Sequence, residues 1–260
     1  MELQSQNIAL IQGHLRVAGM AYRSGEYHAA FRNLNSAVHE IEEAHAQLED
    51  LDHHELKRLF GKVELALGMY KQAEQAFREA IDLGMSSNLI PRKSIISNTR
   101  HLADCVRLRG KLDEAESLYQ QSIAQLEEPD SKVGSQLAKA YMGLAQVYLD
   151  AQRLPEAEKA LTKALEMFEN NPGERSFWFG ISLVTLARLR CAQGNTIESK
   201  DILQQSLTIL EPLLGPHHPI RALVLGRLAN ILNLEGNEQT ASMILSELKE
   251  VEKYLKDHDT

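Results

Sequence analysis

Apolar residues recur every three or four positions through most of the 260-residue chain, and short polar segments interrupt them at regular intervals. Apolar spacing of this kind lines one face of an α-helix. Five of the interruptions contain a glycine, in SGEY, LGMY, RGKLDEA, QGNTIES and EGNEQTA, and the sixth, QRLPEA, contains a glutamine instead. The pattern therefore predicts an all-α chain of helix–turn–helix units.

Six anchor residues mark these predicted turns, and their spacing is nearly constant. The anchors are Gly25, Gly68, Gly110, Gln152, Gly194 and Gly236, which lie 43, 42, 42, 42 and 42 residues apart. Glycine after the last turn of a helix permits the left-handed backbone conformation that ends it. Gln152 is expected to cost about 1 kcal/mol at such a position.

Residue size also repeats at fixed distances from each anchor. Small residues lie seven positions before it, at Ala18, Gly61, Ala103, Ala145, Ala187 and Ala229, and five positions after it, at Ala30, Ala73, Ala115, Ala157, Ser199 and Ala241. Larger residues lie nine positions after it, at Leu34, Phe77, Tyr119, Leu161, Leu203 and Leu245. The small residues would let two antiparallel helices approach closely, and the larger ones would fill the joint with the next repeat.

The pattern predicts two helices in each repeat, one before the anchor and one after it. First helices are expected at 3–23, 53–67, 91–109, 132–151, 175–193 and 218–235, and second helices at 26–49, 69–83, 111–127, 154–169, 195–213 and 237–256. The repeats would occupy about 8–50, 51–90, 91–130, 131–172, 173–216 and 217–258 of a single solenoid domain that spans residues 1–260.

These columns resemble the tetratricopeptide repeat (TPR), and the resemblance covers nearly the whole chain. The period of about 42 is similar to that of the longer repeats found in kinesin light chains and many bacterial proteins. The segment Leu214-Gly215-Pro216-His217-His218-Pro219 resembles the Leu-Gly-x-x-His-Pro signature found between such repeats. The resemblance implies a right-handed α-α superhelix, a TPR solenoid of about six repeats.

The resemblance further implies that the first helices line a concave groove in which partner peptides lie. Residues thirteen, ten, nine and six positions before each anchor, here called the inner rows, would face that groove. The candidate partner-binding residues are Arg16, Arg58, Lys62, Arg100, Asp104, Arg107, Lys139, Gln146, Arg188, Arg227 and Asn230, with Arg107 lying one turn beyond Asp104. Arginine binds carboxylates well, so an acidic partner segment is one hypothesis. The alternative is a solvated face whose arginines pair with nearby acids.

Charge and composition exclude several classes of function. A formal net charge of −8 argues against wholesale binding of nucleic acid or anionic membranes, and no apolar run is long enough to span a bilayer. The N-terminus has no basic segment of the signal-peptide type. Cys105 and Cys191 are expected to be buried, reduced thiols of a cytoplasmic protein.

We find no catalytic, cofactor or metal motif, so we expect neither an enzyme nor a bound cofactor or metal. The pairs His53-His54 and His217-His218 start first helices, where solvated histidines are common. Trp178, the single tryptophan, is expected to pack in the core, with an exposed partner contact as the alternative.

The sequence thus favours a non-catalytic scaffold or adaptor that binds a protein or peptide segment. A regulatory peptide-sensing receptor and an accessory subunit of an enzyme or transport assembly are alternatives, and a homodimer through a terminal repeat is left open. Such receptors usually carry a DNA-binding domain, for which the early start of the first helix leaves no room. Chaperone-binding TPR proteins hold a C-terminal carboxylate with a set of Lys and Asn residues on consecutive first helices. In the equivalent column of this chain only Asn230 matches that set, and the residues of the other repeats do not fit it: Lys62, Asp104, Gln146 and Arg188. We therefore expect no clamp of that type.

Overall fold

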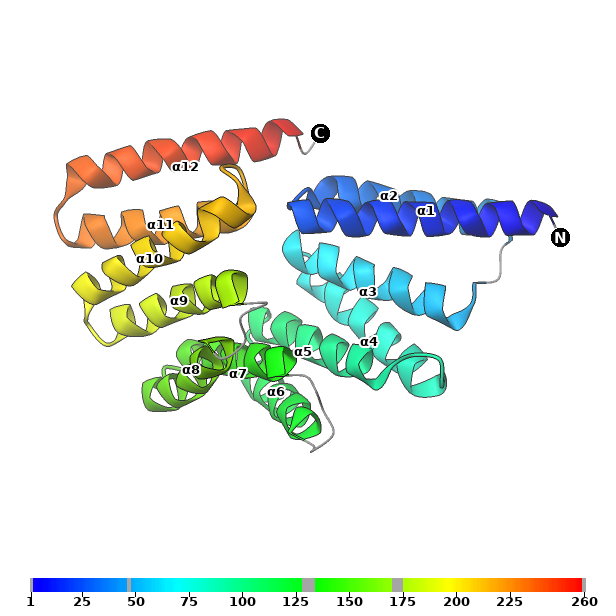
Figure 1. Ribbon diagram of the computed structural model, residues 1–260, viewed down its shortest axis with the longest axis horizontal. Helices are drawn as coiled ribbons and strands as arrows, with labels where there is room; N and C mark the ends of the chain where they lie inside the picture. The colour runs from blue at the N-terminus through cyan, green and yellow to red at the C-terminus, as the bar shows by residue number, and fades with distance from the viewer. Residues whose placement is uncertain (1, 46–47, 128–133, 170–174, 259–260) are drawn as a thin grey trace. The chain divides into compact units, whose positions relative to one another are not determined.

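The computed structural model describes residues 2–45, 48–127, 134–169 and 175–258. These residues form twelve α-helices and no strand, which confirms the all-α class (Figure 1). The helices are α1 (Glu2–Ser24), α2 (Tyr27–Glu43), α3 (Asp50–Ala66), α4 (Tyr70–Ser86), α5 (Arg92–Leu108), α6 (Leu112–Leu126), α7 (Gly134–Asp150), α8 (Leu154–Glu169), α9 (Arg175–Ala192), α10 (Thr196–Leu214), α11 (Pro219–Leu234) and α12 (Glu238–His258). Within the described ranges, no helix combines the length and apolar character needed to cross a bilayer.

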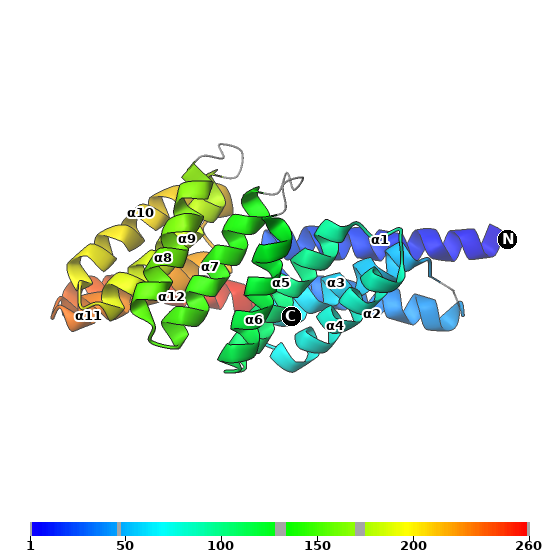
Figure 2. The same cartoon turned by 90° about the horizontal axis from the view of Figure 1, so that it is seen from below.

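The chain divides into two compact units, one up to Leu118 and one from Tyr119 to His258. In the first unit, α1 pairs with α2 and α3 with α4, while α2 packs on α3 and α4 on α5. In the second unit, α7 pairs with α8, α9 with α10 and α11 with α12, and α8 packs on α9 as α10 does on α11 (Figure 2). Each hairpin therefore covers the next within its unit, while the single-domain organisation stays a prediction.

All six predicted anchors lie in the left-handed region, with φ between 60° at Gln152 and 86° at Gly194. At Gly110 the amide donates to the carbonyl of Arg107 at 2.9 Å, and the next amide, of Lys111, donates to Val106 at 2.9 Å. This pair of bonds defines a Schellman motif, and the other five anchors make the equivalent two bonds. The carbonyl of Lys111 then accepts from the amide of Ala115 at 3.1 Å, so the second helix starts at once.

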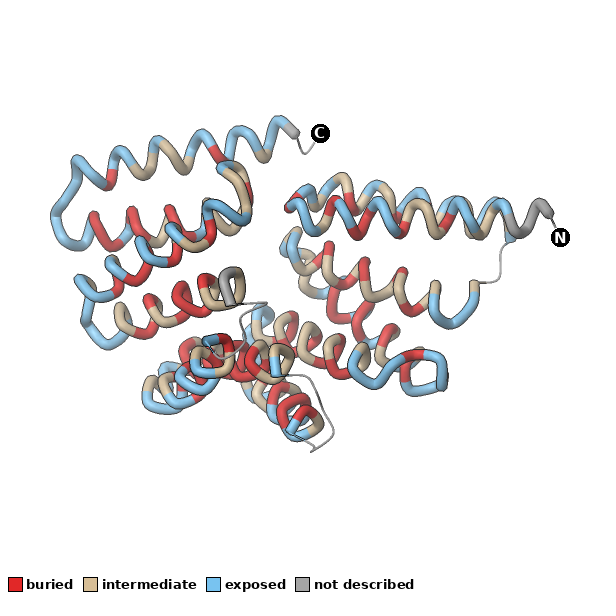
Figure 3. Tube along the Cα trace, viewed as in Figure 1, coloured by how far each residue is buried: buried red, intermediate tan, exposed pale blue. Residues whose placement is uncertain are grey.

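The predicted columns form the contacts between paired helices. All six residues five positions after the anchors are 0 % exposed, and buried positions concentrate on the facing sides of the helices (Figure 3). Ser199 donates from Oγ to the carbonyl of Ala187 at 2.7 Å, which joins two of the predicted small columns directly. Val17, one position before the small residue Ala18, is 49 % exposed and lies outside these contacts.

Three predicted helix limits were wrong, and one of them is the start of α3, which lies at Asp50 rather than at residue 53. Helix α2 ends at Glu43 rather than at residue 49, because Glu40, Glu42 and Glu43 place negative charge at its C-terminus and no basic residue lies in its last turn. Helix α4 continues past residue 83 to Ser86, since Gly84 packs closely on Ile95 of α5. The repeat boundaries predicted at 130–131 and 172–173 lie outside the described residues.

The proline-rich segment between α10 and α11 separates two helices as predicted. Gly215 ends α10 with a φ of 76°. The Nδ1 atom of His218 accepts from the amide of Ile220 at 3.2 Å and caps α11, which begins with Pro219. Proline is suited to this first helical position because its missing amide proton has no partner there in any case.

Candidate functional site

In the first unit, two of the predicted basic residues, Arg58 and Lys62, contact neighbouring side chains. Arg58 donates from Nε to Glu55 at 2.7 Å. Lys62 lies over the ring of Tyr22, with Nζ 5.6 Å from the ring centre. The structure thus connects α3 with α1 through a cation–π contact and places Arg58 in a local ion pair.

Arg100 belongs to a compact polar cluster on α5. Its guanidinium donates to Nε2 of His101 at 2.8 Å and lies 3.4 Å from Asp104, while His101 stacks on Phe77. Burial, followed by the charge of Arg100, lowers the pKa of His101 to about 3. Burial alone would raise the pKa of Asp104, but His101 and the charges of Arg100 and Arg107 hold it at about 2. Arg100 and Asp104 therefore form a charged pair beside a neutral imidazole.

A cleft of about 500 Å³ lies between α1 and α3 in the first unit. It is lined by Gln12, Leu15, Arg16, Gly19, Met20, Arg23, Asp52 and Glu55. Gln12 donates to Asp52 at 2.9 Å at this lining. Five of these residues, Gln12, Leu15, Arg16, Gly19 and Glu55, come from the predicted inner rows. Arg16 is thus the candidate basic residue that faces an open cleft in this unit.

In the second unit, two candidate residues of α7 contact α9. Nζ of Lys139 lies 4.3 Å from the ring centre of Trp178, and Gln146 donates to Thr185 at 3.2 Å. Trp178 is half-buried, so the expectation of a core tryptophan was wrong. The ring also contacts Phe177 edge-on, with 5.0 Å between ring centres.

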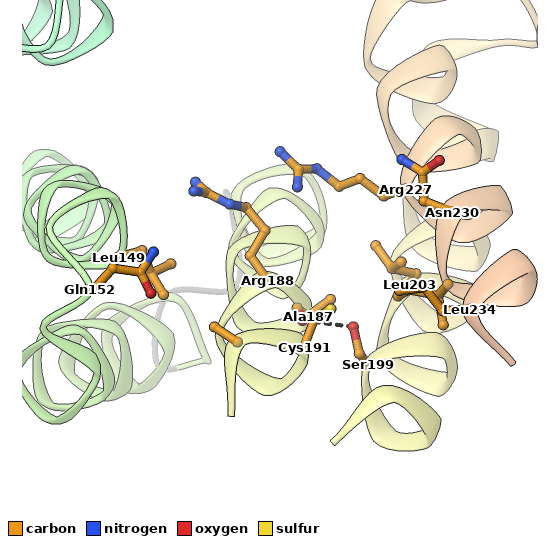
Figure 4. Close-up of a pocket in the computed structure, with 12 residues that line it drawn as sticks. Leu149, Gln152, Ala187, Arg188, Cys191, Ser199, Leu203, Arg227, Asn230 and Leu234 are labelled. Carbon is orange, nitrogen blue, oxygen red and sulfur yellow. Dashed lines mark hydrogen bonds between the residues drawn. The ribbon is translucent and has the colours of Figure 1, made fainter. Parts of the chain in front are cut away.

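A second cleft, of about 350 Å³, lies among α7, α9, α10 and α11. Its lining comprises Leu149, Gln152, Ala187, Arg188, Cys191, Ala192, Ser199, Leu203, Arg227, Asn230, Ile231 and Leu234. Figure 4 shows the guanidinium groups of Arg188 and Arg227 at one end of this cleft, with Leu149 and Leu203 on opposite sides. The structure thereby brings together Arg188, Arg227 and Asn230, which the sequence proposes from two different repeats.

The two arginines of this cleft differ in their pairing. Arg188 donates to Asp150 at 2.8 Å. The Nε atom of Arg227 is buried and has no hydrogen-bond partner among the described residues. Burial, and then the neighbouring charge of Arg188, lower the pKa of Arg227. The charge of Arg188 is therefore balanced by Asp150. The charge of Arg227 is partly removed from water, which costs free energy.

The inner rows miss several lining residues of the second cleft. Leu149 and Cys191 lie three positions before their anchors, in the column that also contains Arg107. If the inner rows had included the position three residues before the anchor in every repeat, both residues would have been identified. Asp150 could not be identified in this way, because its role depends on the side-chain conformation of Arg188 on another helix.

Several histidines depart from the expected solvated state. His54 is buried and lies 3.0 Å from Asn98, and burial lowers its pKa. His218 is buried as the cap of α11, and His217 stacks on Tyr254 with 3.9 Å between ring centres. These side chains are held by tertiary contacts that the sequence does not display. Among the described residues, no three His, Cys, Asp or Glu side chains gather closely enough to hold a metal ion.

The two cysteines occupy different environments. Cys105 is buried as expected, and burial raises the pKa of its thiol. Cys191 is only half-buried and lines the second cleft, so the expectation of a core thiol was wrong for this residue. Its position three residues before Gly194 turns it toward the cleft.

Comparison with curated proteins gives distant relatives. The chain is 22% identical over 228 residues to kinesin light chain-related protein 2 of Arabidopsis thaliana, a match covering 71% of this chain and 34% of that protein. It is 26% identical over 166 residues to a clustered mitochondria protein homolog of Vanderwaltozyma polyspora, covering 60% and 13%. The chain thus spans about a third or less of the curated relatives it matches.

Solved structures with similar folds include two crystallised with peptides or factors. A Rap protein complexed with competence and sporulation factor matches with a TM-score of 0.72 at 12% identity, covering 98% of this chain and 78% of that one. NprR in complex with its cognate peptide NprX gives 0.72 at 10% identity, covering 95% and 68%. BtubC (BKLC) of P. vanneervenii gives 0.57 at 16% identity, covering 96% and 92%. At these identities, the likeness shows the fold.

Residues 54–253 match the family described as MalT-like TPR region, which is well over half of the chain. Together with the structural matches, this result confirms the predicted all-α helical-repeat superhelix. The chain belongs to the MalT-like TPR region family and is a tetratricopeptide repeat protein of the kinesin-light-chain-like variety.

Proposed function

We propose that this protein is a non-catalytic scaffold that binds a segment of a partner protein along the inner rows of its first helices. The observation that carries this proposal is the position of the two clefts. Residues of the inner rows line both of them, Arg16 and Glu55 in the first unit and Arg188, Arg227 and Asn230 in the second. A groove with apolar walls and a few polar groups is the usual setting for a bound segment.

Fold-level similarity adds support of a weaker kind. The similar Rap and NprR structures were solved with a bound factor or peptide. The same likeness supports a peptide-sensing receptor as a second candidate function. Because a shared fold does not fix a ligand, both candidates depend on the residues of the clefts.

An acidic partner segment is the finer part of this proposal. Arg58, Arg100 and Arg188 already have acidic partners within the protein, so they add less to binding than their charges suggest. Arg16 and Arg227 line the clefts and carry most of the argument. A cytoplasmic location stays a prediction.

The proposal can be tested by quantitative capture of partners from an extract. One variant combines Arg16→Gln with Arg23→Gln in the first cleft, and another combines Arg188→Gln with Arg227→Gln in the second. The matched control is Lys71→Gln with Lys159→Gln, which removes the same charge from exposed positions on second helices.

We expect at least one cleft variant to retain about tenfold less of a partner that the control retains fully, in keeping with the loss of one or two charge-assisted hydrogen bonds. Equal retention of every partner by the wild-type protein, the control and both cleft variants would contradict the proposal.

A further inference from the structure

The cleft of the second unit has a charged end and an apolar body. Arg188 and Arg227 converge at the charged end, near the amide of Asn230 (Figure 4). The body is built from Leu149, Ala187, Leu203 and Ile231, which are buried, and from Leu234. Leu234 is 74 % exposed, so it forms an outer wall that solvent reaches.

The charges at this end do not cancel. Arg188 and Arg227 contribute two positive charges, and Asp150, which pairs with Arg188, contributes one negative charge. One positive charge is therefore left, on Arg227, whose buried Nε–H has no acceptor among the described residues. A single carboxylate beside this guanidinium supplies the missing charge, whereas a phosphate dianion would bring excess negative charge close to Asp150.

The apolar body requires a second chemical group beside the carboxylate. A volume of about 350 Å³ is at the small end of the ligand-pocket range of roughly 300–1,000 Å³. Branched aliphatic side chains lining such a space favour an aliphatic occupant, which gains free energy by leaving water. First helices of three successive repeats border the cleft, so a partner segment can cross it rather than end in it.

We propose that this cleft binds an internal Asp or Glu residue of a partner segment together with a neighbouring Leu, Ile or Val. The carboxylate lies between Arg188 and Arg227, and the aliphatic side chain lies on Leu203 and Ile231 beside Leu234. This inference rests on the proposed function, because it names the chemistry of the segment that the scaffold binds.

The first test uses hexapeptides with an acetylated N-terminus and an amidated C-terminus, so that only a side chain can supply a carboxylate. Three peptides have alanine at the outer positions and Glu-Leu, Gln-Leu or Glu-Ala at the centre. Titration followed by the NMR signals of the arginine Nε–H groups reports even weak binding. We expect the Glu-Leu peptide to bind at least tenfold more tightly than either of the others. Equal affinities, or no shift of the Arg227 signal, would overturn the proposal.

The second test separates a ligand-binding arginine from a structural one. Arg227→Met removes a poorly solvated charge, so the free protein should melt at the same or a higher temperature while its affinity for the Glu-Leu peptide falls at least tenfold. Arg221→Met, on the same helix, is the control: Arg221 pairs with Glu211 and Glu247, so its loss should lower the melting temperature and leave peptide affinity unchanged. A lower melting temperature with unchanged affinity for Arg227→Met would show a structural role and overturn the proposal.

Leu234→Ala tests the apolar half of the site at an exposed position where stability should hardly change. It should weaken the Glu-Leu peptide about threefold to tenfold and leave the Glu-Ala peptide unaffected. Equal weakening of both peptides would contradict the placement of the aliphatic side chain. If none of the peptides binds while partner capture still depends on Arg16 and Arg23, this inference is wrong and the proposed scaffold function stands.

Discussion

At the residue scale, Gln152 ends α7 in a conformation that glycine adopts more readily. Its φ of 60° places a side chain in the left-handed region. We expect Gln152→Gly to raise the free energy of unfolding by about 0.5–1 kcal/mol, measured by chemical denaturation. Ala151→Gly, one residue earlier, should lower it because it only adds chain entropy to the unfolded state. Equal losses in the two variants would contradict this account of the turn.

Glu64 of α3 is a buried carboxyl group with an unusual proton affinity. Its Oε2 atom is buried without a hydrogen-bond partner among the described residues, and burial raises its pKa from 4.5 to about 7. Because the folded state holds this proton more tightly than the unfolded state, Glu64 stabilises the fold least at high pH. Stability should therefore fall as the pH rises from 4.5 through 7.

Glu64→Gln tests this prediction by removing the ionisation. We expect the variant to be more stable than the wild-type protein at pH 8, by about 1–3 kcal/mol, and to show little advantage at pH 5. Thermal melts at the two pH values measure the difference. An advantage of the same size at both pH values would show that packing, rather than ionisation, causes it.

At the scale of the element, the approach of α6 to α7 depends on Gly143. A Cβ atom added there would lie 2.3 Å from Cε1 of Tyr119, which is fully buried. Gly143→Ala should therefore lower the free energy of unfolding by about 1–3 kcal/mol, measured by urea denaturation. Gly134→Ala, at the start of the same helix, meets no atom within 4 Å and should be neutral or stabilising. Similar losses in both variants would contradict the packing argument.

Charged residues also connect neighbouring hairpins. Glu74 of α4 pairs with Arg78 on its own helix and with Arg109 at the end of α5, and its side chain is only 10% exposed. Burial alone would raise the pKa of Glu74, but hydrogen bonds from Arg78 and Arg109 lower it below 4.5. The stabilisation from this carboxylate is therefore present at neutral pH and is lost as the pH falls below 4.5.

Glu74→Gln should lower the free energy of unfolding at pH 7 by about 1–3 kcal/mol, because two arginines lose a charged acceptor. The loss should shrink as the melts are repeated at pH values falling below 4.5, because protonation then removes the stabilisation that the wild-type carboxylate provides. Glu156→Gln is a suitable control, since Glu156 pairs with Arg153 at an exposed position and should change stability little. A pH-independent loss for Glu74→Gln would rule out the ionic explanation.

At the scale of the whole molecule, the repeat spacing was sufficient to predict the hairpins. The six anchors and the small columns depend on backbone conformation and residue size, which recur in the sequence with the period of the fold. Helix ends were less predictable, since the end of α4 depends on the contact of Gly84 with Ile95 in the next hairpin.

The candidate site was predictable only in part. Periodicity, together with the resemblance to TPR proteins, placed Arg188, Arg227 and Asn230 in the inner rows, and the structure finds all three around one cleft. The pairing of Arg188 with Asp150, the unpaired Nε of Arg227 and the capping role of His218 depend on side-chain conformations across helices. No spacing within the sequence reports such contacts.

The central claim, that partners bind along the first helices, is tested most directly by site-specific photocrosslinking. A photoreactive amino acid replaces Met20 or Leu234 in the clefts, or Met85 or Met243 at exposed positions on second helices; all four wild-type side chains are exposed and apolar. We predict partner adducts at Met20, Leu234 or both, and few at Met85 and Met243. Adducts confined to Met85 and Met243 would contradict the account.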